Sequence, residues 1–147
     1  MKKVFLLLAL SATLYANADP KPAVTERILK AFKETFRDAK EISWHEYSEY
    51  YQASFKLNEV QFRAQYADDG TLIKMIRYYK EDQLLPMITA KLKRKYAGKE
   101  IFGVTETTSA DAVQFVINLK DDNNWYVVES DIFGNLKETD RFRRADK

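Results

Sequence analysis

The chain repeats one apolar pattern, and this internal repetition constrains its fold more than any other feature of the sequence. Two sets of four apolar residues, each spaced four residues apart, are separated by a constant offset of 60 positions. They are Val24, Ile28, Phe32 and Phe36, and Leu84, Ile88, Leu92 and Tyr96. This spacing places each set on one face of a helix. Each set then leads through alternating apolar segments to a glycine turn, at Gly70 and at Gly134. Because two copies of a pattern support each other, we expect two similar structural units.

The segments after each expected helix alternate between apolar and polar residues, which is typical of antiparallel strands with one buried face. The segment 71–79 is ambiguous, because apolar residues occupy both of its faces. We expect an α+β fold of two tandem repeats, each with one helix packed on a four-stranded antiparallel sheet. The pattern predicts helices at 24–37 and 84–97, and strands at 42–47, 51–57, 60–66, 71–79, 101–107, 113–119, 125–131 and 136–142.

The first 18 residues have the features of a secretory signal peptide. Lys2 and Lys3 precede a short apolar run, Val4–Leu10, and Ala16-Asn17-Ala18 fits the small-x-small cleavage rule. The run is too short to span a bilayer, which needs about 20 residues. We therefore expect cleavage near Ala18, a periplasmic or secreted product, and repeats at 19–80 and 81–147 packed as one compact unit. An uncleaved N-terminal anchor is the alternative.

Charge and cysteine content exclude several classes of function. Lys2 and Lys3 are the only charged residues in 1–18, so cleavage leaves 22 basic and 22 acidic residues. A chain with balanced charge is a poor general binder of polyanions, so we expect no nucleic-acid partner. The absence of cysteine excludes disulfides, a thiol nucleophile and a lipid-bearing cysteine.

Catalytic and metal-binding patterns are weak. His45 is the only histidine, which excludes a multi-histidine metal site, and four glycines form no phosphate-binding loop. The acidic pairs at 68–69 and 121–122 lack the alternating spacing of a calcium loop and fit turns instead. The basic residues of 91–99 and 141–144 fit a solvated helix face and a charged tail. We therefore predict no enzymatic activity, no cofactor and no membrane span after cleavage.

Aromatic residues are the best candidates for contact with a partner. Tyrosine and tryptophan tolerate one dry side and one wet side, and for this reason they are enriched in binding surfaces. Trp44, Tyr47 and Tyr50 lie close together near the first expected hairpin. If Tyr126 faces inward, Trp125 lies on the outer face of the second sheet. These four residues, Trp44, Tyr47, Tyr50 and Trp125, are our candidate partner-binding residues.

The first copy resembles a known exported family. The matching segments are Ala31–Lys40, Ile42–Trp44, Tyr50–Phe55 and Ala67–Leu72, and they look like the PepSY-like proteins of the β-lactamase-inhibitor-protein-like group. The resemblance covers nearly all of the exported chain but weakens in the second copy, where Ser130–Gly134 replaces the aromatic-acidic-glycine run. It implies a tandem-repeat fold and a periplasmic setting in Bacteroidetes-type bacteria. The inhibitor that gives the group its name binds an enzyme across a concave sheet, and PepSY domains have been proposed to restrain peptidases.

These observations together predict a non-catalytic exported module that binds an unknown periplasmic protein or peptide through its sheet faces, in the manner of an inhibitor. The alternative is a carrier of a small ligand, or an envelope-stress protein, with a pocket between the repeats. A pull-down with variants of Trp44 and Trp125 would separate the two.

Overall fold

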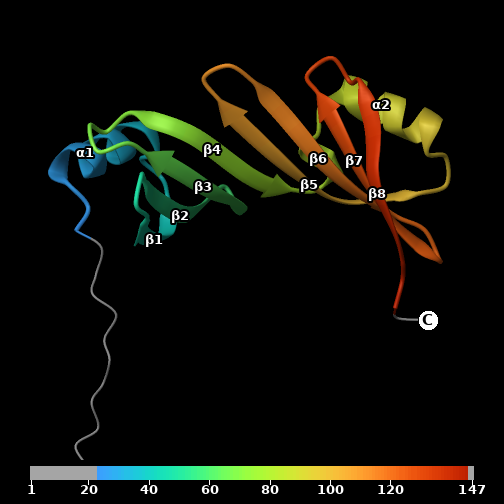
Figure 1. Ribbon diagram of the computed structural model, residues 1–147, viewed down its shortest axis with the longest axis horizontal. Helices are drawn as coiled ribbons and strands as arrows, with labels where there is room; N and C mark the ends of the chain where they lie inside the picture. Colours follow the sequence, from blue (N-terminus) through green and yellow to red (C-terminus); the bar gives the residue numbers. More distant parts are fainter. Residues whose placement is uncertain (1–22, 146–147) are drawn as a thin grey trace, which may run out of the picture.

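The computed structural model describes residues 23–145, which form one eight-stranded sheet and two short α-helices (Figure 1). The elements are α1 (Glu26–Thr35), β1 (Lys40–Glu46), β2 (Tyr51–Leu57), β3 (Val60–Tyr66), β4 (Leu72–Tyr79), a 3-10 turn η1 (Glu81–Gln83), α2 (Pro86–Lys95), β5 (Glu100–Ser109), β6 (Val113–Lys120), β7 (Asn124–Asp131) and β8 (Leu136–Arg143). Each element expected from the sequence is present within a few residues of its predicted bounds.

Both helices are short, and their ends follow from local chemistry. The Thr25 hydroxyl accepts a hydrogen bond from the backbone N–H of Ile28 at 3.3 Å and so caps α1. Pro86 occupies the first turn of α2, where its missing N–H costs nothing. Each helix buries the middle of its apolar ladder, Ile28 and Phe32 in α1 and the equivalent pair in α2. Most of their stability therefore comes from packing on the sheet.

All eight strands pair antiparallel in the order in which they occur in the chain. The pairing continues without a break from β4 to β5, from Lys74 opposite Ser109 to Tyr79 opposite Val104. The predicted fold class, two repeats that each have one helix on a separate four-stranded sheet, is therefore wrong. The protein is mostly β, with a single sheet. A free β4 would expose a long unpaired edge, and pairing with β5 satisfies its backbone groups.

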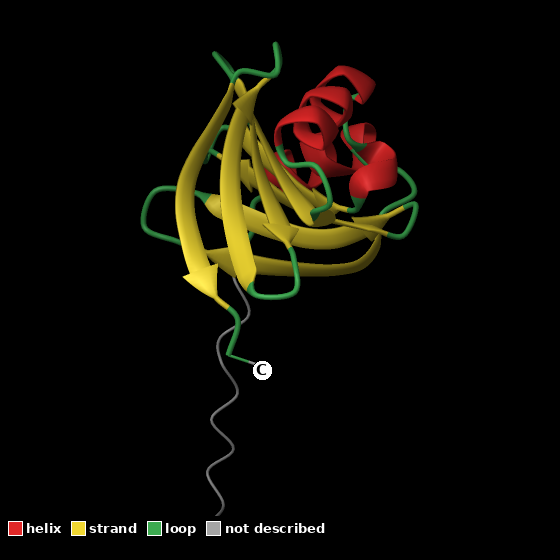
Figure 2. Cartoon of the chain, turned by 90° about the vertical axis from the view of Figure 1, so that its right-hand side faces the viewer, coloured by secondary structure: helices red, strands yellow, loops and turns green. Residues whose placement is uncertain are grey.

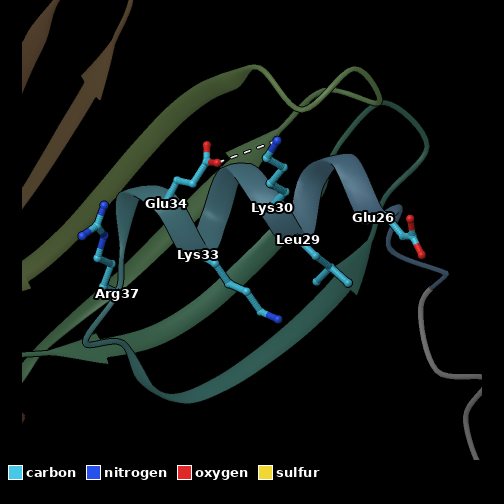
Figure 3. A pocket seen from close by; sticks show the side chains of 6 residues that line it. All are labelled: Glu26, Leu29, Lys30, Lys33, Glu34 and Arg37. Carbon is cyan, nitrogen blue, oxygen red and sulfur yellow. Dashed lines mark ion pairs between the residues drawn. The ribbon is translucent and has the colours of Figure 1, made fainter.

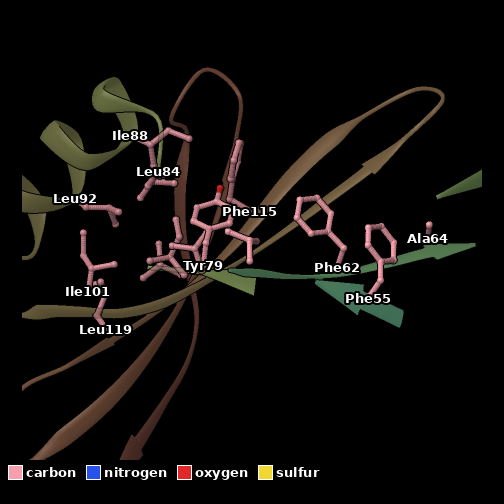
Figure 4. Close-up of a cluster of buried hydrophobic side chains, with 14 of the residues drawn as sticks. Phe55, Phe62, Ala64, Tyr79, Leu84, Ile88, Leu92, Ile101, Phe115 and Leu119 are labelled. Atoms are coloured by element: carbon pink, nitrogen blue, oxygen red, sulfur yellow. The ribbon is translucent and has the colours of Figure 1, made fainter. Parts of the chain in front are cut away.

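One face of the sheet carries the hydrophobic core, and both helices lie on that face (Figure 2). The buried side chains run from α1 and the first strands to α2 and the last ones, and Figure 4 shows part of this cluster. They include Phe55, whose ring centroid lies 5.0 Å from that of Phe32 in α1, and Ile117 and Leu119 in β6. Neither helix covers the opposite face, which we call the uncovered face.

Two glycine turns bring hairpins close to the helices. Gly70, in the β3–β4 turn, has φ +87°, and a Cβ there would lie 3.3 Å from the backbone oxygen of Arg27. Gly134, in the β7–β8 turn, has φ +71° and lies against the Lys91 side chain. Both positions favour glycine for its backbone conformation, and Gly70 also needs it because the helix backbone lies so close.

The predicted signal peptide, residues 1–18, lies outside the described residues. Within 23–145, neither helix has the length and apolar character needed to cross a membrane.

Candidate functional site

Cations and aromatic rings alternate across the uncovered face, strand after strand. The outward direction of these residues follows from their neighbours, since Arg63 lies between buried Phe62 and Ala64, and Trp125 precedes buried Tyr126. We call this row the cation–aromatic band. Its members are Arg63 in β3, Tyr78 in β4, Lys80 just after β4, Phe102 in β5, Lys120 in β6, Trp125 in β7 and Arg144 just after β8.

Phe102 is the centre of the band. The β5–β6 register shifts between Ile101 and Gly103, and this bulge makes Phe102 the extra residue. Its ring is 41% exposed and meets the Trp125 ring edge-on, with centroids 4.8 Å apart and planes at 85°. Edge-to-face geometry is favourable for two aromatic rings. The two rings therefore support each other on an open surface.

Two lysines flank the Phe102 ring. The Lys80 Nζ lies 4.4 Å from the ring centroid, and the Lys120 Nζ lies 4.7 Å from it. Lys80 also donates a hydrogen bond to the Phe102 carbonyl oxygen at 2.9 Å, and Lys120 forms an ion pair with Glu100 at 3.2 Å. These contacts fix both ammonium groups beside the ring. Each ammonium has three donors, so each retains capacity to bind an acceptor from a partner.

The band continues on both sides of this centre. The Arg63 guanidinium carbon lies 5.4 Å from the Tyr78 ring centroid, and that of Arg144 lies 5.9 Å from the Trp125 ring. Tryptophan, tyrosine and arginine are the residues that most often dominate the binding energy of protein interfaces. The composition of the band is therefore that of a protein-binding surface.

Asp121 supports the end of the band nearest to Trp125. Its carboxylate accepts hydrogen bonds from the Tyr126 hydroxyl at 2.6 Å, from Lys99 at 2.9 Å, and from two backbone N–H groups of the β6–β7 turn. These donors favour the charged form and hold the pKa of Asp121 well below its usual range. Arg144 donates to the Asp121 carbonyl oxygen at 3.1 Å, which ties the chain after β8 to this turn.

A shallow depression of about 500 Å³ lies beside Phe102. It is open to solvent, and the residues that line it come mainly from β4, from the segment after β4 and from β5. They include Tyr78, Phe102, Thr105, Glu59 and Asp82. Pockets for small molecules bury most of the surface of their ligand, and this open depression does not. It therefore suits a side chain of a partner protein better than a small molecule.

Of the four residues predicted to contact a partner, Trp125 lies in the cation–aromatic band. Trp44 faces the helix side, where its ring lies 5.3 Å from Phe32 and 6.1 Å from Tyr66, and it packs against the core. Tyr47 and Tyr50 stack on each other at 4.6 Å in the β1–β2 turn. The structure thus brings Tyr47 and Tyr50 together but places both of them, with Trp44, in the β1–β2 part of the sheet, several strands from Trp125 in β7.

Sequence reasoning missed Phe102, Lys80 and Lys120. The bulge that turns Phe102 outward has no periodic signature, and a regular strand across 100–109 places Phe102 and Val104 on the same face. The glycine at 103, next to an aromatic residue inside a strand, was the available signal, since an isolated glycine in a strand often marks a bulge.

A second polar group lies on the helix side, where β4 pairs with β5. Glu106, which is buried, accepts a hydrogen bond from the Tyr79 hydroxyl at 2.6 Å and pairs with Arg77 at 2.7 Å. Burial, together with the hydrogen bond to Glu106, raises the pKa of Tyr79 above its usual range. The Arg77 guanidinium, through Nη2, and the Tyr79 hydroxyl both bind the Glu106 carboxylate, while the buried Arg77 Nε has no hydrogen-bond partner among the described residues. We assign the three side chains a structural role at the β4–β5 pairing.

The surface of α1 that faces solvent also forms a depression (Figure 3). It is lined by α1 and by Arg37 just after it; the residues are Glu26, Leu29, Lys30, Lys33, Glu34 and Arg37. Lys30 and Glu34 are 4.0 Å apart and largely exposed, as expected for an i, i+4 pair on a solvated helix. This surface carries no sign of a site. In the described part of the chain, no three acidic or histidine side chains are grouped to hold a metal ion.

Comparison with known proteins shows the fold. No family model matches the chain, and no curated protein matches it in sequence. Among solved structures, a BLIP-like protein from Bacteroides fragilis has a TM-score of 0.65 at 15% identity, covering 83% of this chain and 89% of that one. A DUF2874 family protein from Bacteroides ovatus has a TM-score of 0.64 at 18% identity, covering 85% and 91%. A protein from Bacteroides eggerthii, assigned to the periplasm by inference, has a TM-score of 0.64 at 14% identity, covering 83% and 90%. The chain thus shares the fold of BLIP-like Bacteroides proteins over most of its length.

Proposed function

We propose that this protein is a non-catalytic periplasmic module that binds a protein or peptide through the uncovered face of its sheet. The cation–aromatic band carries this proposal, because it gathers the residue types of interface hot spots on a face that neither helix covers. The periplasmic setting is supported by the signal-like residues 1–18 and by the Bacteroides proteins of the same fold.

An inhibitor-like role belongs to the same surface. The sequence resembles a group named after an inhibitor that binds an enzyme across a concave sheet, and this supports an enzyme as the partner, although the matching residues are not inhibitor contacts. The BLIP-like protein of Bacteroides fragilis supports this by fold alone. The carrier alternative receives less support, since the depression beside Phe102 is open to solvent.

Cross-linking in a periplasmic extract, followed by affinity recovery of the tagged chain, tests the proposal. We expect a specific protein to be recovered with the wild type and lost with Phe102→Ala or Trp125→Ala. Truncation of one anchor at such a site costs about 2 kcal/mol, or roughly thirtyfold in affinity.

Phe133→Ala is the matched control, because Phe133 is 66% exposed in the β7–β8 turn, outside the band. Equal recovery with all variants would contradict the assignment of this face. Recovery of a bound small molecule without any protein would favour the carrier.

A further inference from the structure

The two edges of the sheet differ in their protection against pairing with another strand. Five of the eight residues of β8 are charged, and such an edge resists addition of a strand. The centre of β1, at the other edge, is Ile42-Ser43-Trp44, which carries no charge. Ile42 is 46% exposed there. This edge is therefore the one that is open to a further strand.

The free backbone groups of β1 can be assigned from its pairing with β2. Tyr47 donates its N–H to the Tyr50 carbonyl at 2.9 Å, and the register runs unbroken from there back to Ser43. Along an antiparallel ladder, residue pairs joined by backbone hydrogen bonds alternate with pairs that are not. The odd-numbered residues from 43 to 47 therefore direct their backbone groups to β2, and the even-numbered residues from 42 to 46 direct theirs to the free edge.

We propose that β1 pairs antiparallel with β1 of a second copy of this chain, with Ser43 opposite Ser43 of that copy. In this register Ile42 lies opposite Trp44 of the second copy, and both residues have their backbone groups directed to the edge. The pair also places two apolar side chains side by side on one face, which covers the exposed Ile42. The two copies are related by a two-fold axis through Ser43, so each contact between residues of the two strands occurs twice.

Charge complementarity selects this register. Lys40 and Glu46, of opposite sign, meet at the ends of the strands, whereas Glu41 is already paired with Lys56 of its own chain at 2.8 Å. A shift by two residues in either direction places Ile42 opposite Glu46, or Trp44 opposite Lys40, and so sets a charge against an apolar side chain. The bulge at Glu41, with φ 53°, keeps the regular ladder short, so the dimer is weak and forms at high concentration.

Sedimentation equilibrium of residues 19–147 tests the pairing. We expect dimerisation of the wild type and an increase of about tenfold or more in the dissociation constant of Ile42→Glu. Ile132→Glu is the control, because Ile132 is 42% exposed in the distant β7–β8 turn. A wild type that stays monomeric at millimolar concentration overturns the proposal, and so does an equal effect of the two substitutions.

The register is tested separately by disulfide formation, since the chain has no cysteine of its own. Ser43→Cys places two thiols on the two-fold axis, in a non-hydrogen-bonded pair where the backbones are closest. We expect rapid oxidation to a covalent dimer and much slower oxidation of His45→Cys, whose thiol lies opposite residue 41. Faster cross-linking of His45→Cys overturns the register.

Discussion

At the scale of single residues, two buried tyrosines differ in how their hydroxyl groups are satisfied. The Tyr79 hydroxyl donates to Glu106, whereas the Tyr66 hydroxyl has no hydrogen-bond partner among the described residues. Burial raises the pKa of Tyr66 to about 12. The two rings thus contribute similar apolar packing. The hydrogen-bonded hydroxyl of Tyr79 stabilises the fold, whereas the buried, unpaired hydroxyl of Tyr66 destabilises it.

Substitution of each tyrosine by phenylalanine tests this difference. We expect Tyr79→Phe to lower the free energy of unfolding by about 1.5–3 kcal/mol, because it leaves a buried carboxylate with one donor fewer. Tyr66→Phe is expected to be neutral or slightly stabilising. Urea denaturation of both variants measures the effect, and an equal loss for the two would contradict the assignment.

Asp121 predicts a dependence of stability on pH. Its pKa is lowered in the folded state, mainly by the Tyr126 hydroxyl and Lys99, so the folded protein binds fewer protons than the unfolded chain. The stabilisation is therefore complete above the unfolded pKa of about 4, and it is lost as pH falls toward the lower folded pKa. We expect Asp121→Asn to be less stable than the wild type at pH 7 and to lose less stability upon acidification.

Denaturation midpoints measured across this acidic range provide the check. Parallel acid profiles of the wild type and Asp121→Asn would show that the Asp121 carboxylate contributes nothing to the acid sensitivity. Asp111→Asn, at an exposed position in the β5–β6 turn, is a suitable control.

At the scale of elements, the hairpin turns and the helices depend on each other through glycine. Gly70 and Gly98 both have positive φ, but a Cβ at Gly70 meets the Arg27 backbone, whereas one at Gly98 meets nothing within 4 Å. We expect Gly98→Ala to cost about 1–2 kcal/mol for the left-handed backbone alone. Gly70→Ala is expected to cost more, because α1 must move. Thermal unfolding of the two variants compares them directly, and equal losses would argue against a tight contact between the β3–β4 turn and α1.

The elements also show where prediction from sequence succeeded and failed. Alternation predicted which residues of β3 and β7 face inward, and Val60–Tyr66 shows the expected burial at every second position. Apolar residues on both faces of β4 were the visible sign of its position in the middle of the sheet. They could not identify β5 as its neighbour, because the periodicity of apolar residues indicates which side chains are buried and not which strands pair. The cation–aromatic band was missed for a similar reason, since it depends on one bulge and on contacts across five strands.

At the scale of the whole molecule, the unbroken sheet predicts that the chain unfolds as one unit. The β4–β5 pairing and the Arg77–Glu106 ion pair join the two halves, and each half contains one of the two tryptophans. Trp44→Phe leaves Trp125 as the single tryptophan, which reports on the second half. Trp125→Phe leaves Trp44, which reports on the first half. We expect each reporter to give the same unfolding midpoint as circular dichroism of the same variant.

A difference between fluorescence and circular dichroism in either variant would show that the halves unfold separately. Glu106→Gln, which weakens the ion pair at the β4–β5 pairing, should lower the midpoint of both reporters together. A shift in only one of them would place the cooperative unit within a half.

The order of the strands bears on how the chain reaches this fold. Every described strand hydrogen-bonds only to the strands that precede and follow it along the chain. All pairings except β4–β5, whose connection contains η1 and α2, therefore close a short loop at small entropic cost. Under the export that we propose, a sheet of this kind can grow from its first hairpin as successive strands leave the channel, without waiting for the C-terminus. Assembly would then proceed in the direction of translocation, with β8 as the last strand to be added.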